Sequence, residues 1–257
     1  MSYDICEAID WRGVAIDCKT CRHQDLKERG LCRLGHACVN DRYARRIDRF
    51  FNWNPSLANA YVRHEHFEVR AIAAKHAAVF LLPPLLYDPE EAVRWNAARR
   101  LPRRLIMKLC DDPHREVRIR IVSLLDDRDL VAMMDDPDYY VRLVICRRIN
   151  PNLLVKMVHD EETEVRRVVA ARLPRQLLPS MTDDREAVVR LEVARRLPAD
   201  TLHLMKNDPD WRIRHEVASR MDVAEIGSLI DDEDSLVREM VQSRLADRRE
   251  MTKDVSK

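Results

Sequence analysis

Residues 88–102 read DPEEAVRWNAARRLP, and residues 184–198 read DREAVVRLEVARRLP. Both stretches contain an apolar residue followed by Arg, and this pair recurs along the chain every 24 residues. The apolar residue, here called the anchor, occupies eight positions: Val69, Val93, Val117, Val141, Val165, Val189, Ile213 and Val237. Counting from twelve residues before each anchor gives the units 57–80, 81–104, 105–128, 129–152, 153–176, 177–200, 201–224 and 225–248. A fixed period of this kind indicates a repeat architecture.

Each unit predicts one α-helix around its anchor. Apolar residues fall at the anchor, four later and eight later, as in Val93, Ala97 and Leu101, which makes one stripe of an amphipathic helix. Asp stands five residues before the anchor in seven units, and in four of them Pro follows it. This pair predicts the helix start, with Asp as the cap and Pro at the first helical position. A Leu-Pro pair predicts the end, because the residue before Pro resists helical geometry.

The rest of each unit is too short for a second full helix with its turns. It carries a Leu-rich cluster such as Leu105, Ile106 and Leu109, which fits one or two turns of 3₁₀-helix. We therefore expect two helical layers whose units bury their apolar faces only against neighbours. The period excludes two-helix HEAT or armadillo units of about 40 residues and ankyrin units of about 33. Leucine-rich repeats are excluded because their alternating Leu strand and its Asn are missing.

The N-terminal leader is rich in cysteine. It contains five of the seven cysteines in the chain: Cys6, Cys18, Cys21, Cys32 and Cys38. Two residues separate Cys18 from Cys21, a spacing that lets two thiolates reach one centre, and the next pair is wider. Four thiolates suit either a Cys₄ zinc site or a cubane iron–sulfur cluster. Zinc usually uses two short Cys-x₂₋₄-Cys pairs, so the wider pair favours a cluster. In a zinc site, His23 and His36 could also be ligands.

The 24-residue D-P-x-x-x-V-R-x-x-x-A-x-R-L-P unit behind a cysteine-rich leader resembles the leucine-rich repeat variant family over essentially the whole chain. The resemblance implies an all-α, right-handed solenoid of alternating α- and 3₁₀-helices without β-sheet, spanning residues 57–248. It also implies a four-iron, four-sulfur (4Fe-4S) cluster in an N-terminal domain, residues 1–56. Carried onto this sequence, the ligands are Cys18, Cys21, Cys32 and Cys38. Cys6 is a spare that could replace one of them or simply pack.

Other parts of the chain complete this expectation. Residues 42–53 are expected to form a connecting helix that caps the first repeat, and residues 249–257 a flexible C-terminal tail. Apolar residues of the leader could shield a cluster from water: Trp11, Val14, Ile16, Leu31 and Leu34. Cys110 and Cys146 occupy repeat positions that are apolar in other units, so we expect them in the core.

Arg follows every anchor, and the residues of interest are Arg94, Arg118, Arg142, Arg166, Arg190 and Arg214 with Asp88, Asp112, Asp136, Asp160, Asp184 and Asp208. One interpretation is a row that binds phosphates or acidic partners. The other is a structural ladder in which each Arg pairs with a loop Asp, within or between units, because the guanidinium fork fits a carboxylate. Lys+Arg (45) and Asp+Glu (44) nearly balance, which favours internal pairing.

Composition and motifs exclude several classes of function. A net charge of +1 gives no whole-protein field that would attract nucleic acid or a membrane. No stretch reaches the roughly 18 apolar residues of a membrane span, and there is no secretory signal. We therefore expect a cytoplasmic protein whose thiols stay reduced. The sequence lacks a nucleophile–base pattern, a Gly-rich phosphate loop and an H-E-x-x-H motif, so we expect no enzyme.

Three hypotheses of function follow. The first is a non-enzymatic iron–sulfur protein, in which a redox or sensing cluster is coupled to a solenoid surface that binds a partner protein. The second is a pure interaction scaffold with a structural metal, since solenoids offer long binding surfaces. The third is nucleic-acid binding along an Arg row, which the near-neutral charge disfavours.

Overall fold

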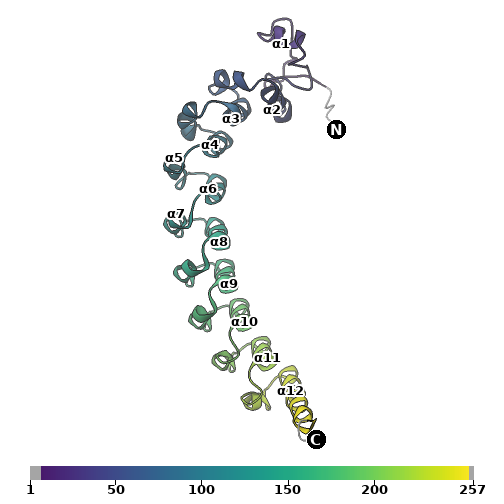
Figure 1. The fold of residues 1–257 in the computed structure, drawn as a ribbon, viewed down its shortest axis with the longest axis vertical. Coiled ribbons are helices and arrows are strands. Elements are labelled where there is room, and N and C mark those ends of the chain that lie inside the picture. The colour runs from purple at the N-terminus through teal and green to yellow at the C-terminus, as the bar shows by residue number, and fades with distance from the viewer. Residues whose placement is uncertain (1–6, 255–257) are drawn as a thin grey trace. The chain divides into compact units, whose positions relative to one another are not determined.

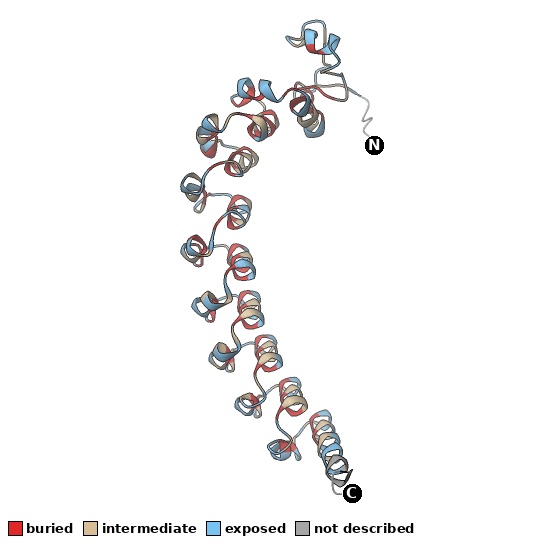
Figure 2. Cartoon of the chain, viewed as in Figure 1, coloured by how far each residue is buried: buried red, intermediate tan, exposed pale blue. Residues whose placement is uncertain are grey.

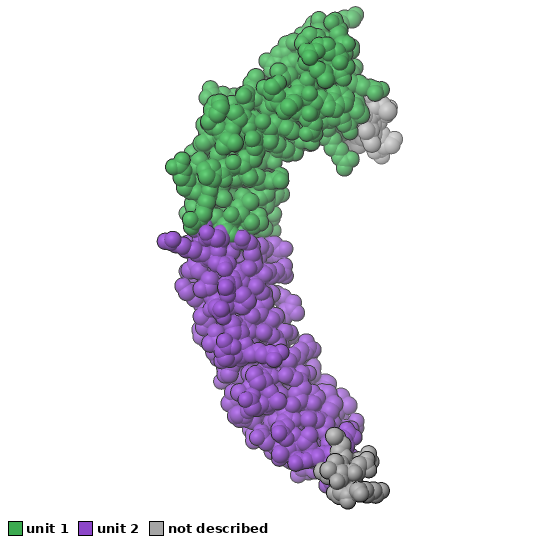
Figure 3. All heavy atoms as spheres, viewed as in Figure 1, with its two compact units in different colours: residues 1–125 green, residues 126–257 purple. Residues whose placement is uncertain are grey.

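The computed structural model describes residues 7–254, with their side chains through residue 249. The chain divides into two compact units, Met1–Leu125 and Asp126–Lys257, called unit 1 and unit 2 (Figure 3). In unit 1 the helices are α1 (Gln24–Glu28), α2 (Ala44–Trp53), η1 (Pro55–Tyr61), α3 (Phe67–His76), η2 (Val79–Leu81), η3 (Pro83–Tyr87), α4 (Glu91–Ala98), α5 (Arg103–Ile106), η4 (Met107–Leu109) and α6 (Arg115–Val122).

In unit 2 the helices are α7 (Asp127–Ala132), α8 (Tyr139–Arg148), η5 (Pro151–Met157), α9 (Thr163–Arg172), η6 (Arg175–Met181), α10 (Ala187–Arg196), η7 (Leu202–Met205), α11 (Trp211–Arg220), η8 (Ile226–Leu229) and α12 (Ser235–Asp254). Here η denotes a 3₁₀-helix. Within unit 2, α8 to α12 follow one another in one layer, and α7 and the 3₁₀-helices form the other (Figure 1). The expected alternation of α- and 3₁₀-helices is confirmed. Two repeats differ: in one, α5 precedes the 3₁₀-helix η4, and in the other α7 replaces the 3₁₀-helix.

The described residues form no β-sheet; their extended pairings are two isolated bridges, Ile9↔Ala15 and Arg33↔Ala37, both in the leader. The predicted connecting helix is α2, which begins at Ala44. Helix α12 continues to Asp254, so the described part of the segment predicted as a tail is helical. The sequence ADRREMTK that follows Leu245 contains neither Gly nor Pro, so nothing in it ends the helix at residue 248.

The core lies between the two layers of each unit (Figure 2). Every anchor is at most 1 % exposed, as the spacing of the apolar stripe predicts. The short helices supply a second buried column, eleven residues before each anchor: Ala58, Leu82, Ile106, Leu130, Leu154, Leu178, Leu202 and Ile226. Each repeat therefore buries apolar side chains from both of its helices.

The predicted start of the α-helix in each repeat is two residues too early. Asp88, for example, precedes α4, whose N-cap is Glu90. The Asp88 carboxylate instead accepts a hydrogen bond from the Glu90 N–H at 3.0 Å, which closes a turn before the helix. Pro89 lies inside this turn and not at the first helical position. The same Asp turn recurs before α6 and α8 to α12, with distances of 2.8 to 2.9 Å.

A second set of arginines, seven residues after the anchor, caps the α-helix of the preceding repeat. The Arg100 Nη1 donates to the Ala74 carbonyl at 2.9 Å, and the Arg244 Nη1 donates to the carbonyls of Ala218 and Met221 at 2.9 and 2.6 Å. Arg172, Arg196 and Arg220 make the equivalent contacts in unit 2. The last carbonyls of an α-helix lack partners within the helix, and a cation there also suits the helix dipole. The repeats are thus joined by polar contacts as well as by their core.

Candidate metal centre and arginine ladder

A tight hairpin precedes Cys18 and Cys21. Its bridge joins Ile9 and Ala15, and Gly13 at the turn has φ +84°, a conformation that favours glycine. The Asp10 carboxylate accepts hydrogen bonds from the backbone N–H groups of Arg12 and Val14, both at 2.9 Å. These bonds contribute to holding the pKa of Asp10 below its ordinary value, against the opposing effect of burial. Local hydrogen bonds therefore fix the chain just before the cysteine loop.

Cys18 and Cys21 lie on one short loop that begins at Asp17. The Asp17 carboxylate accepts a hydrogen bond from the Lys19 N–H at 2.8 Å, which turns the chain between the two cysteines. Both thiols are half-buried. The Asn40 amide donates to the Cys21 sulfur at 3.7 Å, so a residue that follows the last leader cysteine contacts this loop.

Cys32 and Cys38 flank the second hairpin, whose bridge joins Arg33 and Ala37 and whose turn has Gly35 at φ +69°. The hairpin returns the chain and brings the two thiols together. Their interaction lowers the pKa of Cys32 and, with burial, raises the pKa of Cys38. Cys38 is 4 % exposed, whereas Cys32 is half-buried.

Helix α2 is hydrogen-bonded to the end of the second hairpin. The Arg46 carbonyl accepts a hydrogen bond from the Cys38 N–H at 3.2 Å. The buried Arg46 guanidinium donates to Asp41 at 2.9 Å and to the Glu7 carbonyl at 3.0 Å. At the other end of α2, the Asn54 amide donates to the Leu31 carbonyl at 2.8 Å. The residues that lead into and out of this cysteine pair are therefore tied to one helix.

The first repeat also contacts the leader, through Tyr61 of η1. The Arg22 Nε donates to the Tyr61 hydroxyl at 3.0 Å, and its guanidinium lies 4.5 Å from the centre of that ring. The His23 Nε2 contacts the same hydroxyl. Since Arg22 and His23 directly follow Cys21, Tyr61 of the first repeat packs against the end of the cysteine loop.

Trp11 makes a second contact between the leader and the first repeat. Its ring stacks on His66 at 5.3 Å between centroids and meets the edge of His64 at 4.9 Å. Burial lowers the pKa of both histidines, which favours their neutral forms. Trp11 is therefore used to attach the leader to α3 and the turn before it.

The two cysteine pairs lie near each other. Ionisation of Cys18 or Cys21 would raise the pKa of Cys32, and ionisation of Cys21 or Cys38 would raise that of Tyr61. All four thiols are free of disulfides. Among residues 7–254, no three His, Cys, Asp or Glu side chains are arranged to hold a single metal ion. A zinc ion with Zn–S bonds of about 2.3 Å would hold its sulfurs roughly 4 Å apart. A cubane places iron and sulfide between its four thiolates, and this donor set fits such a group.

The remaining candidate ligands lie elsewhere or have other contacts. Cys6 lies outside the described residues. Cys146 is buried in α8, where burial raises its pKa to about 12, and its thiol contacts the Met157 sulfur at 3.2 Å. His36 contacts the Arg49 guanidinium through Nδ1 at 2.8 Å.

The expected apolar cover is partly wrong. Val14 is 59 % exposed and Leu34 is 41 % exposed, and each lies within the turn segment of a hairpin. The apolar side chains buried in the leader come instead from α1, α2 and the strand-like segment around Cys38: Leu26, Ala37, Val39, Ile47, Phe50 and Phe51. The signal for three of them was the apolar spacing of Ile47, Phe50 and Phe51 on one helix face.

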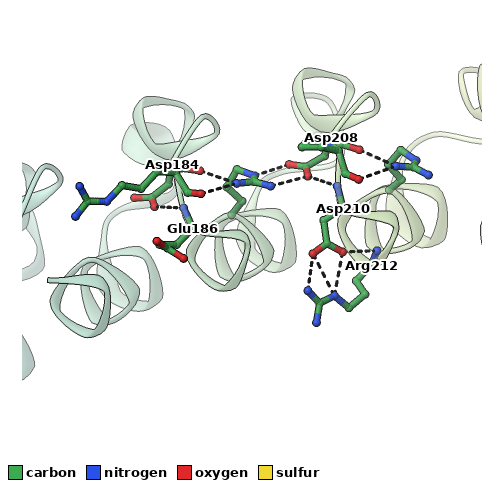
Figure 4. Close-up of polar contacts among 9 residues, drawn as sticks. Asp184, Glu186, Asp208, Asp210 and Arg212 are labelled. Atoms are coloured by element: carbon green, nitrogen blue, oxygen red, sulfur yellow. Dashed lines mark hydrogen bonds and ion pairs between the residues drawn. The ribbon is translucent and has the colours of Figure 1, made fainter. Parts of the chain in front are cut away.

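The anchor arginines form a ladder within each unit. The Nε and Nη2 of one Arg donate to both carboxylate oxygens of the Asp in the next repeat. The pairs and their shortest distances are Arg70–Asp88 (2.7 Å) and Arg94–Asp112 (2.7 Å) in unit 1, and Arg142–Asp160 (2.8 Å), Arg166–Asp184 (2.7 Å), Arg190–Asp208 (2.8 Å) and Arg214–Asp232 (2.8 Å) in unit 2. Figure 4 shows Asp184 and Asp208 in this arrangement.

The third nitrogen of the guanidinium, Nη1, donates to a backbone carbonyl of the same repeat. The Arg190 Nη1 donates to the Asp184 carbonyl at 2.7 Å, and the Arg118 Nη1 donates to the Asp112 carbonyl at 2.8 Å. Asp136 accepts from the Asp138 N–H at 2.9 Å. Hydrogen bonding to the partner Asp raises the pKa of Arg94, Arg142, Arg166, Arg190 and Arg214. Their donors are occupied by the protein itself, so these arginines do not form a free phosphate-binding row.

Comparison with known proteins identifies both parts of the chain. Residues 8–60 match the family described as "LRV protein FeS4 cluster". A solved structure titled "a leucine-rich repeat variant with a novel repetitive protein structural motif" is 40 % identical, with a TM-score of 0.79. That alignment covers 89 % of this chain and 98 % of the other. The chain belongs to the leucine-rich repeat variant family. Its N-terminal segment is the iron–sulfur domain of such a protein, and its repeats form the solenoid.

Other relatives of this leucine-rich repeat variant protein add less. A protein of Rhodobacter capsulatus, named "Uncharacterized 27.7 kDa protein in nifB 3'region", is 54 % identical over 96 residues. The alignment spans 37 % of this chain and 39 % of that protein, which is less than half of either. An engineered protein of known structure is 14 % identical and covers 81 % of this chain, but its TM-score of 0.39 supports no argument. No helix in the described part of the chain is both long and apolar enough to cross a membrane.

Proposed function

We propose that this leucine-rich repeat variant protein is a non-enzymatic redox or sensing protein. Its leader would hold a 4Fe-4S cluster through Cys18, Cys21, Cys32 and Cys38, and its solenoid would bind a partner protein. The observation that carries the proposal is the set of cysteines in the matched segment. Residues 8–60 contain these four cysteines and exclude Cys6.

The protein positions this donor set with little freedom. One cysteine pair lies on the loop buttressed by Tyr61, and the other flanks a hairpin bonded to α2. Fixed thiols lower the cost of ordering ligands when a metal group binds. A bound 4Fe-4S cluster supplies one-electron exchange, with a potential set by hydrogen bonds to the sulfurs and by solvent exposure. The Asn40 amide provides one such hydrogen bond, to Cys21.

Access to the site favours exchange with a partner. Cys38 is buried, whereas Cys18, Cys21 and Cys32 are half-buried, so the site is covered on the side of α2 and accessible elsewhere. The contacts of Tyr61 and Trp11 also link the leader to the first repeat. A conformational change in the leader would therefore alter contacts of the first repeat.

A second candidate function is a scaffold whose cluster is only structural. It is supported by the arginine ladder, because the repeats are joined to one another by contacts that need no metal. The two candidates differ in redox behaviour and not in iron content.

The test is anaerobic purification of the full chain, followed by an absorption spectrum, analysis of iron, sulfide and zinc, and a redox titration. The proposal expects about four irons and four sulfides per chain and a reversible one-electron change within about −700 to +450 mV. A loaded cluster without a redox change in that range would leave the scaffold function. One zinc per chain and no sulfide would overturn the cluster itself.

A further inference from the structure

A half-buried tryptophan on the α-layer of unit 1, Trp95, contacts two arginines. The Arg99 guanidinium is 5.9 Å from the centre of the Trp95 ring, and the Arg120 guanidinium is 5.7 Å from it. Trp95 and Arg99 belong to the repeat of α4, and Arg120 belongs to α6. Both arginines are exposed, and the ring is half-buried. Both guanidinium groups lie within about 6 Å of the ring centre, the range in which the negative face of an aromatic ring attracts a cation.

These two arginines differ from those of the ladder because no carboxylate neutralises them within the described residues. Two repeats of unit 2 show the contrast. At the position of Arg120, three residues after the anchor, α10 has Glu192 and α11 has Glu216. Glu192 lies 4.0 Å from Arg195, and Glu216 lies 3.6 Å from Arg220. The surface is therefore internally paired in α10 and α11 and carries unpaired positive charge at α4 and α6.

A pocket of about 280 Å³ adjoins this cluster. It is lined by Lys75, Asn96, Arg99 and Arg100. Lys75 is held by Asp48 at 2.9 Å, and Arg100 is held by the Ala74 carbonyl at 2.9 Å. The lining thus combines two tethered cations, one free guanidinium and an amide, which can both donate and accept hydrogen bonds.

We propose that Arg99, Trp95 and Arg120, with the adjoining pocket, form a docking site for an acidic segment of a partner protein. Guanidinium groups bind carboxylates through paired hydrogen bonds. Trp and Arg are also the side chains most enriched among the residues that dominate protein interfaces. The contacts with the Trp95 ring restrict both side chains in part, which lowers the cost of ordering them on binding.

The distribution of charge favours a protein segment over nucleic acid. Nucleic acid is bound along a track of phosphate contacts, whereas this cluster is confined to α3, α4 and α6. The anchor arginines that would extend such a track are occupied by Asp residues of the next repeat. The inference rests on the proposed role of the solenoid as a protein-binding surface, and it does not require a redox-active cluster.

The test uses the full chain, purified with its metal content measured, and a fluorescein-labelled oligoglutamate peptide as the probe. Fluorescence anisotropy would give the Kd for the native protein, for the double variant Arg99→Ala/Arg120→Ala and for Arg195→Ala. The last is the matched control, because Arg195 has the repeat position of Arg99 but faces Glu192. Circular dichroism and Tm would check that all variants are folded.

We expect saturable binding that weakens with salt, about tenfold weaker in the double variant and within about twofold of native in Arg195→Ala. Absence of saturable binding, an equal loss in the control, or tighter binding of a single-stranded oligonucleotide of the same charge would each overturn the proposal. A sample with a full cluster that fails to bind the peptide would refute the docking site and leave the redox function standing. A sample that lacks a cluster but binds the peptide would support the docking site and count against the redox function.

Discussion

Arg94 contacts two repeats at once. Its Nε and Nη2 each donate to a carboxylate oxygen of Asp112 in the next repeat at 2.7 Å, while Nη1 donates to the carbonyls of Asp88 and Pro89 in its own repeat. Both charged side chains are at most 9 % exposed. One planar group therefore fixes the distance between neighbouring turns, which the apolar core alone would leave less defined.

Removing one partner of this pair should be costly. In Arg94→Ala, Asp112 would stay buried without its cation, and we expect the free energy of unfolding to fall by about 3 kcal/mol. Arg94→Lys should restore only part of it, since an ammonium cannot make the paired contact. Urea unfolding would measure both. The control is Arg167→Ala, whose exposed pair with Glu164 should contribute no more than about 1 kcal/mol. Equal effects at the two sites would show that the ladder has no special role.

The capping arginines offer a separate test. Arg244→Ala should leave the last carbonyls of α11 without a protein partner and lower the free energy of unfolding by about 1 kcal/mol. Arg248 lies about one turn further along the same helix and is exposed. Arg248→Ala should therefore change stability by less than about 0.5 kcal/mol. Thermal unfolding of both variants would compare them, and a larger effect for Arg248 would contradict the capping role.

Acid should weaken the ladder. The hydrogen bond from Arg214 is the main cause that holds the pKa of Asp232 below its ordinary value of 3.8. A carboxyl whose pKa is lower in the folded state adds stability that is complete above pH 3.8 and is lost as pH falls through the folded pKa. Asp232→Asn should thus be less stable at neutral pH, and its stability should fall less steeply on acidification. Urea midpoints at a series of pH values would reveal parallel curves if Asp232 were not involved.

Iron content should depend on the leader cysteines and not on those of the repeats. Cys38→Ser should lose most of its iron and sulfide, because Cys38 is the buried thiol of the proposed ligand set and lies beside Cys32. Cys146→Ala places in α8 the residue that α4, α9 and α10 have at the same position, so it should keep its iron. Iron and sulfide analysis of anaerobic samples would decide. Retention of a full complement by Cys38→Ser would remove this residue from the ligand set.

The sequence predicted the layers better than the turns. A strict 24-residue period places Val93, Val117 and their equivalents on one buried stripe, and packing follows from burial of that stripe. The helix starts were misplaced because Asp followed by Pro is typical of a helix cap and equally of a turn. Only the position of the next repeat shows that the Asp88 carboxylate is shared between a turn and Arg70.

The leader was harder to predict because few of its contacts follow a period. Cysteine spacing indicated a four-thiol site, but the roles of Tyr61 and Asn40 depend on residues that approach from other segments. Trp11 was named only as a residue that could cover a cluster, and its stacking on His66 could not be read from the sequence. Arg100 and its equivalents were visible as a recurring residue. Their target, a carbonyl of the preceding helix, requires the stacking geometry.

The two ends of the array differ from its middle. The first repeat has His64 where the others have Asp, so it offers no carboxylate to a preceding arginine, and within the described residues Arg238 of the last repeat bonds only to carbonyls of its own turn. Between these ends, the junctions within each unit use the same donor and the same acceptor. Loss or duplication of one whole 24-residue repeat would therefore create a junction in which an Arg still faces an Asp of the next repeat. A gene of this kind can change the length of its product in complete repeats, whereas an insertion of any other size would separate an Arg from its Asp.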